Sequence, residues 1–383
     1  MPQRVILTPL KMRILVFCLA AISLTACTPR GAIDIVPGAK GIGDVEHIYI
    51  GTTRGPDIVG GEPFGIKRQP DPRYVRLDIS IPPDRAPGAI AWPRRGRKAD
   101  PLTQFVTLAQ VDYSGDAPFR ADLSATLRTE PGGKREAVIF VHGFNNTFAE
   151  GAYRWAQLGH DLGVKGALVH YSWPSRASPF GYVYDRDSAL FARDGFEDLL
   201  REVDRAGAQR IVIVGHSVGS LVVMETLRQI GLEKNRALLD KIAGVVLMSP
   251  DIDVDVFRAE ARAVGKLPQP FVIFTSKKDR ALALSARLTG QRDRVGNLPD
   301  AAALAGLKVT LIDTTAFSSG LGHFTVGDSP ALLALLGGIS DVDNAFAQDQ
   351  TGRAGLLGGA VLTVQNATQI ILSPVSAIAG SAP

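Results

Sequence analysis

Cysteine is nearly absent from this chain. The 383 residues contain two cysteines, Cys18 and Cys27, and both lie within the first 27 positions. A mature chain that begins at Cys27 therefore holds no internal disulfide, whichever compartment it occupies. Histidine, cysteine and carboxylate residues with the spacing of metal ligands are also lacking, so we expect no metal and no other cofactor.

A surplus of positive charge is lacking as well once the N-terminus is set aside. The whole chain has a formal net charge of +4. Arg4, Lys11 and Arg13 supply three of those charges within residues 1–26, where no acidic residue occurs. The remaining chain is close to neutral, and this balance gives no indication of a nucleic-acid partner.

The N-terminal basic residues precede an apolar run, ILVFCLAAISLTAC, that ends at Cys27. The run has signal-peptide length and is short for a membrane span. Its last four residues, LTAC, resemble the lipobox of bacterial lipoproteins, in which the cysteine is lipidated and becomes the first mature residue. An ordinary signal peptide or an uncleaved anchor is the alternative. Thr28 is not the aspartate associated with inner-membrane retention, so the expected location is the bacterial cell envelope, at the outer membrane.

Composition divides the chain into four parts. The predicted parts are a lipoprotein signal peptide at 1–26, a Gly/Pro-rich tether at 27–45, a domain at 46–340 and a Gly/Ala-rich C-terminal tail at 341–383. The tail sequence suits a packed terminal helix, a membrane-seeking segment or a loose tail.

Within the domain, strand-like apolar runs alternate with stretches of helical periodicity. Two strands are expected at 47–52 and 75–81, and six more follow in AVIFVHGF, ALVHYSW, RIVIVGHS, AGVVLMSPD, PFVIFTSKKD and KVTLIDTT. This alternation predicts an α/β fold with a mostly parallel central sheet and helices on both faces.

The segment RIVIVGHSVGSLVV, residues 210–223, passes from a β-branched strand into a helical pattern through Gly-His-Ser-Val-Gly. A G-x-S-x-G sequence between a strand and a helix is the nucleophile elbow of α/β-hydrolases. Gly215 and Gly219 allow the strand and the helix to approach each other, and Ser217 stands at the apex. A plain βα turn with a surface serine is the alternative.

A serine nucleophile needs a base, and the base needs a group that orients it. In the α/β-hydrolase fold these residues follow in the order serine, acid, histidine. Of the six histidines only His323 follows Ser217, and it lies in a Gly-rich loop after the last expected strand. We expect His323 to be the base and Asp279, directly after PFVIFTS, to be the acid. Asp251, one strand earlier, is the alternative acid.

Two backbone N–H groups are expected to form the oxyanion hole. One belongs to Val218, which follows the nucleophile at the start of a helix. The other belongs to Phe144 in the loop HGFNN, which follows the strand AVIFV. The alternative for HGFNN is a plain turn shaped by local hydrogen bonds of its polar side chains.

Several segments together resemble a bacterial α/β-hydrolase family catalogued as a domain of unknown function, DUF900, and grouped with esterase- and lipase-like enzymes. They are VHGFNNTFAEGAYRWAQL, YSWPS, GHSVGSLVVMETLRQ, SPDIDVDVF and KKDRALALSARLTG. The resemblance covers roughly residues 45–340. It implies an α/β-hydrolase with a Ser217, Asp279 and His323 triad, and it implies no substrate.

The motifs favour a carboxylic-ester hydrolase that acts on a small-molecule or lipid ester and is held at the membrane through Cys27. An acyltransferase or thioesterase would use the same residues, and an inactive envelope-anchored binding lipoprotein belongs to a different class. Aromatic residues near the segment PSRASPFGYVYDRDSAL either line an acyl pocket or pack in the core; they are Trp173, Phe180, Tyr182 and Tyr184.

Overall fold

The computed structural model describes residues 30–57, 62–94, 96–129, 133–290, 293–318, 320–330, 332–333 and 359–372. The predicted signal peptide and the predicted lipidation site, Cys27, lie outside these residues. None of the described helices is both long and apolar enough to cross a membrane.

The described strands form one sheet in the order β10-β11-β9-β8-β7-β6-β4-β5-β1-β2-β3. Neighbours from β11 through β9, β8, β7, β6, β4 and β5 to β1 pair in parallel, whereas β1–β2, β2–β3 and β10–β11 pair antiparallel. The strand bounds are β1 Asp44–Arg54, β2 Arg68–Ile81, β3 Val106–Asp112, β4 Glu136–Val141, β5 Ala167–Ser172, β6 Arg210–His216, β7 Ile242–Met248, β8 Phe271–Thr275, β9 Val309–Asp313, β10 Gly359–Val364 and β11 Ala367–Leu372.

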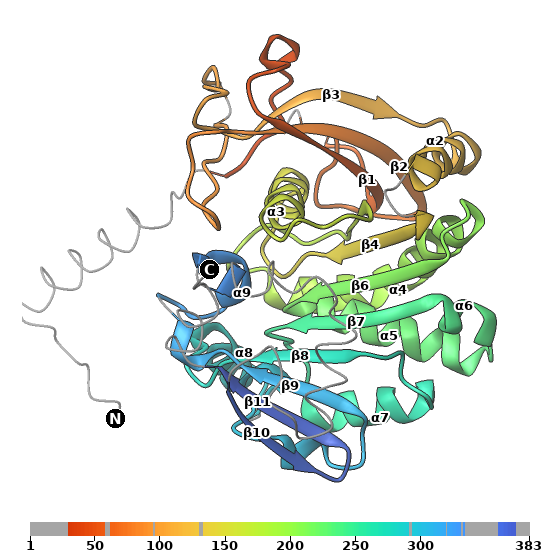
Figure 1. The fold of residues 1–383 in the computed structure, drawn as a ribbon, viewed down its shortest axis with the longest axis vertical. Coiled ribbons are helices and arrows are strands. Elements are labelled where there is room, and N and C mark those ends of the chain that lie inside the picture. Colours follow the sequence, from red (N-terminus) through yellow and green to blue (C-terminus); the bar gives the residue numbers. More distant parts are fainter. Residues whose placement is uncertain are drawn as a thin grey trace, which may run out of the picture.

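Helices cover both faces of the sheet (Figure 1). The helix bounds are α2 Asp116–Thr129, α3 Phe148–Asp161, α4 Tyr182–Arg205, α5 Val218–Leu232, α6 Arg236–Lys241, α7 Val254–Val264, α8 Arg280–Leu288 and α9 Thr325–Asp328. Short 3₁₀ turns lie at Pro37–Ala39, Val295–Asn297, Ala301–Leu304 and Thr315–Phe317. The predicted α/β-hydrolase architecture, with a mostly parallel sheet between helices, is therefore confirmed.

The core lies in two layers, one on each face of the sheet. Strand β4 shows why, since Ile139 and Val141 pack with α4, α5 and α7, while Val138 and Phe140 pack with α3 on the opposite face. Successive side chains of a strand point to opposite faces, and a strand buried on both faces reads as a continuous apolar run. This is the pattern that the sequence AVIFV carries.

The described part of the expected tether packs on the domain. Gly31 forms a β-bridge with Arg94, and Ile35 forms one with Thr107 of β3. The Val36 N–H donates to the Thr107 carbonyl at 2.8 Å. The first strand, β1, already begins at Asp44. Residues 30–43 therefore run along the edge of the sheet.

Two strands lie inside the segment expected to be a Gly/Ala-rich tail. Val364 pairs with Ala367 across a two-residue turn, and β11 then pairs in parallel with β9. Both turn residues, Gln365 and Asn366, have positive φ angles of 43° and 72°. A turn of this kind matches the twist of the flanking strands. The described part of 341–383 thus extends the sheet, and it contains neither a helix nor a loose tail.

Candidate active site

The turn between β6 and α5 has the strained geometry of a nucleophile elbow. Ser217 has φ 52° and ψ −124°, a backbone conformation that residues other than glycine rarely adopt. Two backbone hydrogen bonds hold the turn, from the Ser217 N–H to the Met248 carbonyl at 3.0 Å and from the Asp251 N–H to the Ser217 carbonyl at 3.2 Å. The strain at Ser217 is therefore maintained by the adjacent strand β7 and its exit loop.

Glycine at position 219 allows α5 to approach the end of β4. A Cβ atom there would lie 2.3 Å from the His142 carbonyl oxygen and 2.4 Å from that of Val141. Both contacts are with backbone, which cannot move aside cheaply. The second glycine of G-x-S-x-G thus fixes the elbow against the loop that follows β4.

Ser217, His323 and Asp279 are joined by two hydrogen bonds. His323 Nε2 lies 2.9 Å from Ser217 Oγ, and His323 Nδ1 lies 2.8 Å from Asp279 Oδ2. The tautomer with a proton on Nδ1 satisfies both contacts, because it donates to the carboxylate and accepts from the hydroxyl. The structure thus brings together three predicted residues that are separated by up to 106 positions in the chain.

Asp279 has a second structural role as the N-cap of α8. Its Oδ1 accepts from the Leu282 N–H at 2.9 Å, while Oδ2 faces His323. The residue is 2% exposed. Helix N-termini favour negative charge, so both contacts suit an ionised carboxylate. One carboxylate therefore starts a helix and orients an imidazole.

The loop that carries His323 depends on glycine and on the neighbouring histidine. Gly320 and Gly322 have positive φ angles of 56° and 67°. The ring of His216, the residue before the serine, lies 5.0 Å from the His323 ring and 4.4 Å from the Phe324 ring. Burial, together with the nearby His323, lowers the pKa of His216 well below its usual range. His216 is therefore neutral and packs as an aromatic side chain.

The loop after β4 lies directly against the elbow. A Cβ atom at Gly143 would be 3.0 Å from Ser217 Cβ and 2.6 Å from His216 Nδ1. Within the described residues, the N–H groups of Phe144 and Val218 have no protein acceptor. Both predicted oxyanion donors are thus free to bind an added oxygen atom, and the two segments that carry them are in contact.

A family model described as an alpha/beta hydrolase of unknown function, DUF900, matches residues 116–338. The match spans more than half of the chain. The chain belongs to this DUF900 family. A search of the curated proteins returned no significant match. The family description agrees with the fold and supports a hydrolase in coarse terms, without a substrate.

In this DUF900 chain, the buried side chain of Arg54 supports the loop after β4 through hydrogen bonds. Its guanidinium donates to the Asn146 carbonyl at 2.8 Å and to the Ser175 carbonyl at 3.0 Å. It also lies 3.3 Å from His142 Nε2. Burial lowers the Arg54 pKa to about 10, so the group remains charged at neutral pH. Arg54 is 1% exposed, and it places a fixed positive charge beneath the loop.

His142 belongs to the same support. Its Nδ1 lies 2.8 Å from the Gly143 carbonyl, and its ring stacks on Trp173 at 5.0 Å. The Trp173 Nε1–H donates to the His142 carbonyl at 2.6 Å. Burial, reinforced by the charge of Arg54, lowers the His142 pKa well below its usual range. His142 is therefore neutral, and the local hydrogen bonds expected for HGFNN do shape the loop.

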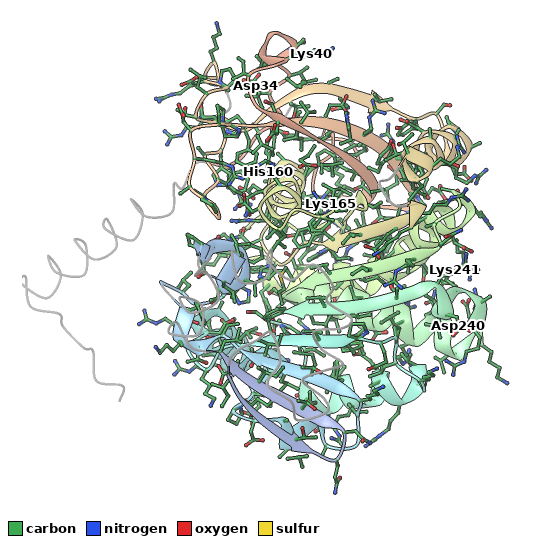
Figure 2. All side chains as sticks on the ribbon, viewed as in Figure 1. Asp34, Lys40, His160, Lys165, Asp240 and Lys241 are labelled. Atoms are coloured by element: carbon green, nitrogen blue, oxygen red, sulfur yellow. The ribbon has the colours of Figure 1, made fainter. Side chains whose placement is uncertain are left out.

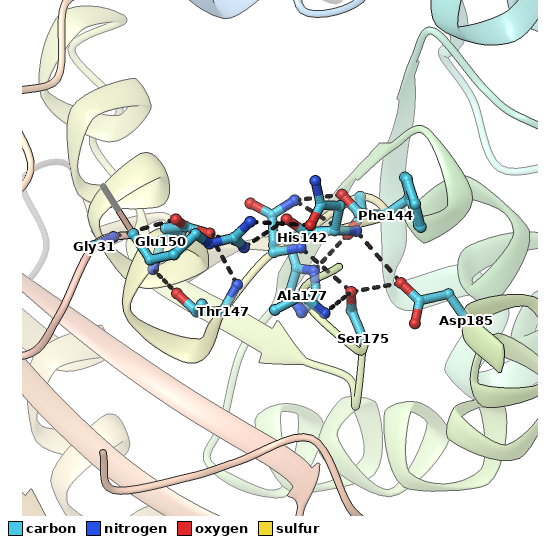
Figure 3. A network of polar contacts seen from close by, with 12 residues as sticks. Gly31, His142, Phe144, Thr147, Glu150, Ser175, Ala177 and Asp185 are labelled. Atoms are coloured by element: carbon cyan, nitrogen blue, oxygen red, sulfur yellow. Dashed lines mark hydrogen bonds and ion pairs between the residues drawn. The ribbon is translucent and has the colours of Figure 1, made fainter. Parts of the chain in front are cut away.

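Two carboxylates hold the loop from opposite sides (Figure 3). Asp185 of α4 accepts from Ser175 Oγ at 2.6 Å and from the Asn145 N–H at 3.4 Å. Glu150 of α3 accepts from the Thr147 N–H at 3.0 Å in a capping box. Arg30 links Glu150 to the loop, since it lies 2.6 Å from Glu150 Oε2 and donates to the Asn145 carbonyl at 2.8 Å.

The alternative acid, Asp251, has other partners. Its Oδ1 accepts from Ser285 Oγ at 2.6 Å and lies 3.2 Å from Arg294 Nε, while its Oδ2 accepts from the Tyr182 hydroxyl at 2.9 Å. Both Asp251 and Arg294 are buried. Of the two aspartates weighed from the sequence, Asp279 therefore contacts His323, and Asp251 ties α4, α8 and the β7 exit loop together.

The aromatic residues proposed as pocket walls separate into two groups. Trp173 is buried beneath His142, and Tyr182 packs edge-on against Phe144 at 5.6 Å. Phe180, in contrast, is 98% exposed. The Tyr184 hydroxyl donates to the Ile66 carbonyl at 3.0 Å. Trp173 thus belongs to the core, and Phe180 lies on the surface beside the site.

Sequence reasoning missed Arg54, Asp185, Glu150 and Arg30. The signal for Arg54 was a charged residue at the end of the apolar strand HIYIGTTR, and the signal for Glu150 was its capping-box spacing from Thr147. Neither signal identifies a partner, because Arg54 contacts segments about 90 to 120 positions away.

Proposed function

We propose that this protein is a serine hydrolase that cleaves carboxylic esters through Ser217, His323 and Asp279. The observation that carries the proposal is the pair of hydrogen bonds from Ser217 to His323 and from His323 to Asp279, at 2.9 and 2.8 Å. A hydroxyl in contact with an oriented imidazole is the arrangement that general-base activation of serine requires.

In the first half of the reaction, Ser217 Oγ attacks the carbonyl carbon of the ester while its proton passes to His323 Nε2. The carbonyl oxygen becomes an oxyanion that accepts hydrogen bonds from the N–H groups of Phe144 and Val218. Each such donor contributes about 3 to 4 kcal/mol to transition-state stabilisation. His323 then gives the proton to the leaving alkoxide, so an alcohol departs and an acyl-enzyme remains.

In the second half, a water molecule gives a proton to His323 Nε2 and attacks the acyl carbonyl. The same N–H groups stabilise the second oxyanion, and the proton returns to Ser217 Oγ as the carboxylic acid leaves. Asp279 holds the Nδ1–H of His323 throughout, which keeps Nε2 available as the acceptor. Arg54, beneath the loop, favours the negative charge that develops on the substrate oxygen.

The proposed setting is the bacterial cell envelope, with the chain attached through a lipid on Cys27. Firm anchoring of this kind needs more than one acyl chain, because a single chain gives only reversible binding. The lipobox-like sequence LTAC supports this part of the proposal. A small-molecule or lipid ester in that setting is the proposed substrate.

The test is hydrolysis of p-nitrophenyl esters of graded acyl length by the full chain. Ser217→Ala is expected to lower kcat by roughly a thousandfold or more, because the nucleophile is lost while the binding groups remain. Ser124→Ala on α2 is the matched control and is expected to retain the wild-type rate. Equal rates in all three proteins would overturn the proposal, and a wild type inactive on every ester would favour a binding lipoprotein.

A further inference from the structure

Large exposed apolar side chains lie on three segments that follow the C-terminal ends of strands β5, β8 and β9. They are Phe180, Val183, Leu284, Leu288 and Leu321, which are 98%, 76%, 57%, 65% and 66% exposed. We call these five residues the rim surface. Single exposed apolar residues are ordinary on soluble proteins, whereas a group of large ones beside a site indicates an interaction surface.

The elements that carry the rim surface are in contact with one another. The Tyr182 hydroxyl lies 2.6 Å from Ser285 Oγ, which joins the start of α4 to α8. The Arg280 N–H donates to the Leu321 carbonyl at 3.0 Å, which joins α8 to the loop of His323. The rim surface therefore spans three neighbouring elements at the proposed active site.

Helix α8 turns apolar residues outward in a regular way. Leu282 and Ser285 are buried, whereas Leu284 and Leu288, four positions apart, are exposed. Residues four apart lie on one face of a helix. Packing inside the domain thus uses one face of α8, and the exposed face carries Leu284 and Leu288 together with Arg280 and Arg287.

Basic side chains accompany the rim surface. Lys277, Lys278 and Arg280 line a cavity of about 300 Å³ that also includes Asp279 and Gly322. Lys277 pairs with Asp313 at 3.5 Å, whereas the side chains of Lys278 and Arg280 have no ion-pair partner within the described residues. Exposed apolar residues beside unpaired cations match the chemistry of an anionic lipid surface, which attracts both.

The start of the described chain lies close to the same C-terminal ends of the strands. Arg30 binds Asn145, whose neighbour Phe144 packs against Tyr182 at the beginning of α4. Cys27 precedes Arg30 by three residues, a distance of at most about 11 Å even in an extended chain. A lipid on Cys27 would therefore hold the C-terminal ends of the strands near the bilayer.

We propose that the rim surface docks on a bilayer of anionic phospholipid. Esters embedded in the bilayer then reach Ser217 from the plane of the membrane, and this second part rests on the proposed ester hydrolysis. The rim side chains enter the interface, while Lys278 and Arg280 bind lipid phosphates.

The test measures the orientation of the full chain on vesicles, with no turnover. Three single-cysteine variants, Phe180→Cys, Leu288→Cys and Asp240→Cys, are made in a background of Cys18→Ser, Cys27→Ser and Ser217→Ala. Asp240 is exposed and lies on α6, on the side of the molecule opposite α8 and α9 (Figures 1 and 2). Each cysteine carries an environment-sensitive fluorophore, and the vesicles contain phosphatidylcholine with about one third phosphatidylglycerol.

Docking predicts a blue shift of the fluorophore at positions 180 and 288, with quenching by brominated phosphatidylcholine, and no change at position 240. Lys278→Glu with Arg280→Glu is expected to lower the partition coefficient on the anionic vesicles roughly tenfold. The proposal is wrong when the fluorophores at all three positions respond alike to vesicles. It is also wrong when the emission at positions 180 and 288 shifts with protein concentration in the absence of vesicles, which indicates self-association. Because Ser217→Ala is used throughout, failure of docking leaves the proposed chemistry untouched.

Discussion

On the side of the site that carries Ser217, here called the serine side, the residues are placed by the elements that carry them and by the adjacent strand β7, whereas the loop that carries Phe144 is held by segments distant in the sequence. Ser217 is fixed by the β6–α5 turn, and Asp279 is fixed as the N-cap of α8. The loop instead depends on Arg54 from β1, Asp185 from α4 and Arg30 from the N-terminal segment. The elbow and the adjacent strand β7 thus set the proposed nucleophile and the N–H of Val218, whereas contacts from distant segments set the N–H of Phe144.

The largest expected effect separates the two aspartates on the serine side. Asp279→Asn should lower kcat for ester hydrolysis by about 10⁴-fold, because the amide favours the wrong tautomer of His323. Asp251→Asn should change kcat far less and should instead lower the free energy of unfolding by about 3 to 5 kcal/mol, since it leaves Arg294 buried without its carboxylate. Steady-state kinetics and urea unfolding of both variants check this, and a larger kcat loss in Asp251→Asn would contradict it.

The next prediction addresses the tertiary support of the loop. Arg54→Leu removes the donors that satisfy the carbonyls of Asn146 and Ser175, and it should lower the free energy of unfolding by about 3 to 5 kcal/mol. Arg193→Leu is the matched control, because the Arg193 side chain is 39% exposed and, among the residues that the structure describes, its ion-pair partner is the neighbouring Asp194. Equal unfolding midpoints for the two variants in urea would show that Arg54 does not support the loop.

A smaller effect is expected where the two sides meet. Gly143→Ala places a Cβ atom 3.0 Å from Ser217 Cβ, so the loop must move away from the elbow. We expect kcat/KM to fall by about a hundredfold, with a loss of roughly 1 to 3 kcal/mol in stability. Gly38→Ala, which meets nothing within 4 Å, is the control and should match the wild type. A fully active Gly143→Ala enzyme would remove Phe144 from the proposed oxyanion hole.

The smallest effect on catalysis is expected for Glu260, a buried carboxyl group of α7. Burial and the nearby Glu225 of α5 raise the pKa of Glu260 in α7 to about 9. Between its ordinary pKa and about 9, the folded chain holds a proton that the unfolded chain has lost, so the free energy of unfolding falls as pH rises through this window. Glu260→Gln should abolish this slope and should therefore be more stable than the wild type at pH 9.

Unfolding of Glu260→Gln should match that of the wild type below the ordinary pKa of glutamate, where the side chain at position 260 is neutral in the folded and unfolded states of both proteins. Asp71→Asn, at an exposed position of β2, provides the control and should follow the wild type at every pH. Parallel curves for the wild type and Glu260→Gln across the range would contradict the raised pKa.

The sequence predicted the elements near the serine far better than those that support the loop. Ser217 was predicted from the G-x-S-x-G motif, which is a local sequence signal. His323 was predicted from the order of triad residues in the α/β-hydrolase fold. Arg54 and Asp185 could not be predicted, because each acts through partners in other segments and no motif names those partners. The hairpin at 359–372 was missed for a related reason, since its turn is Gln365-Asn366 and contains no glycine.

The most direct test of the account asks which atom forms the covalent bond. The full chain is treated with a fluorophosphonate, and the modified peptide is identified by mass spectrometry. The account predicts a single adduct on Ser217 that is absent in Ser217→Ala and strongly slowed in His323→Ala. An adduct on another residue, or ester hydrolysis that persists with Ser217 unmodified, would contradict it.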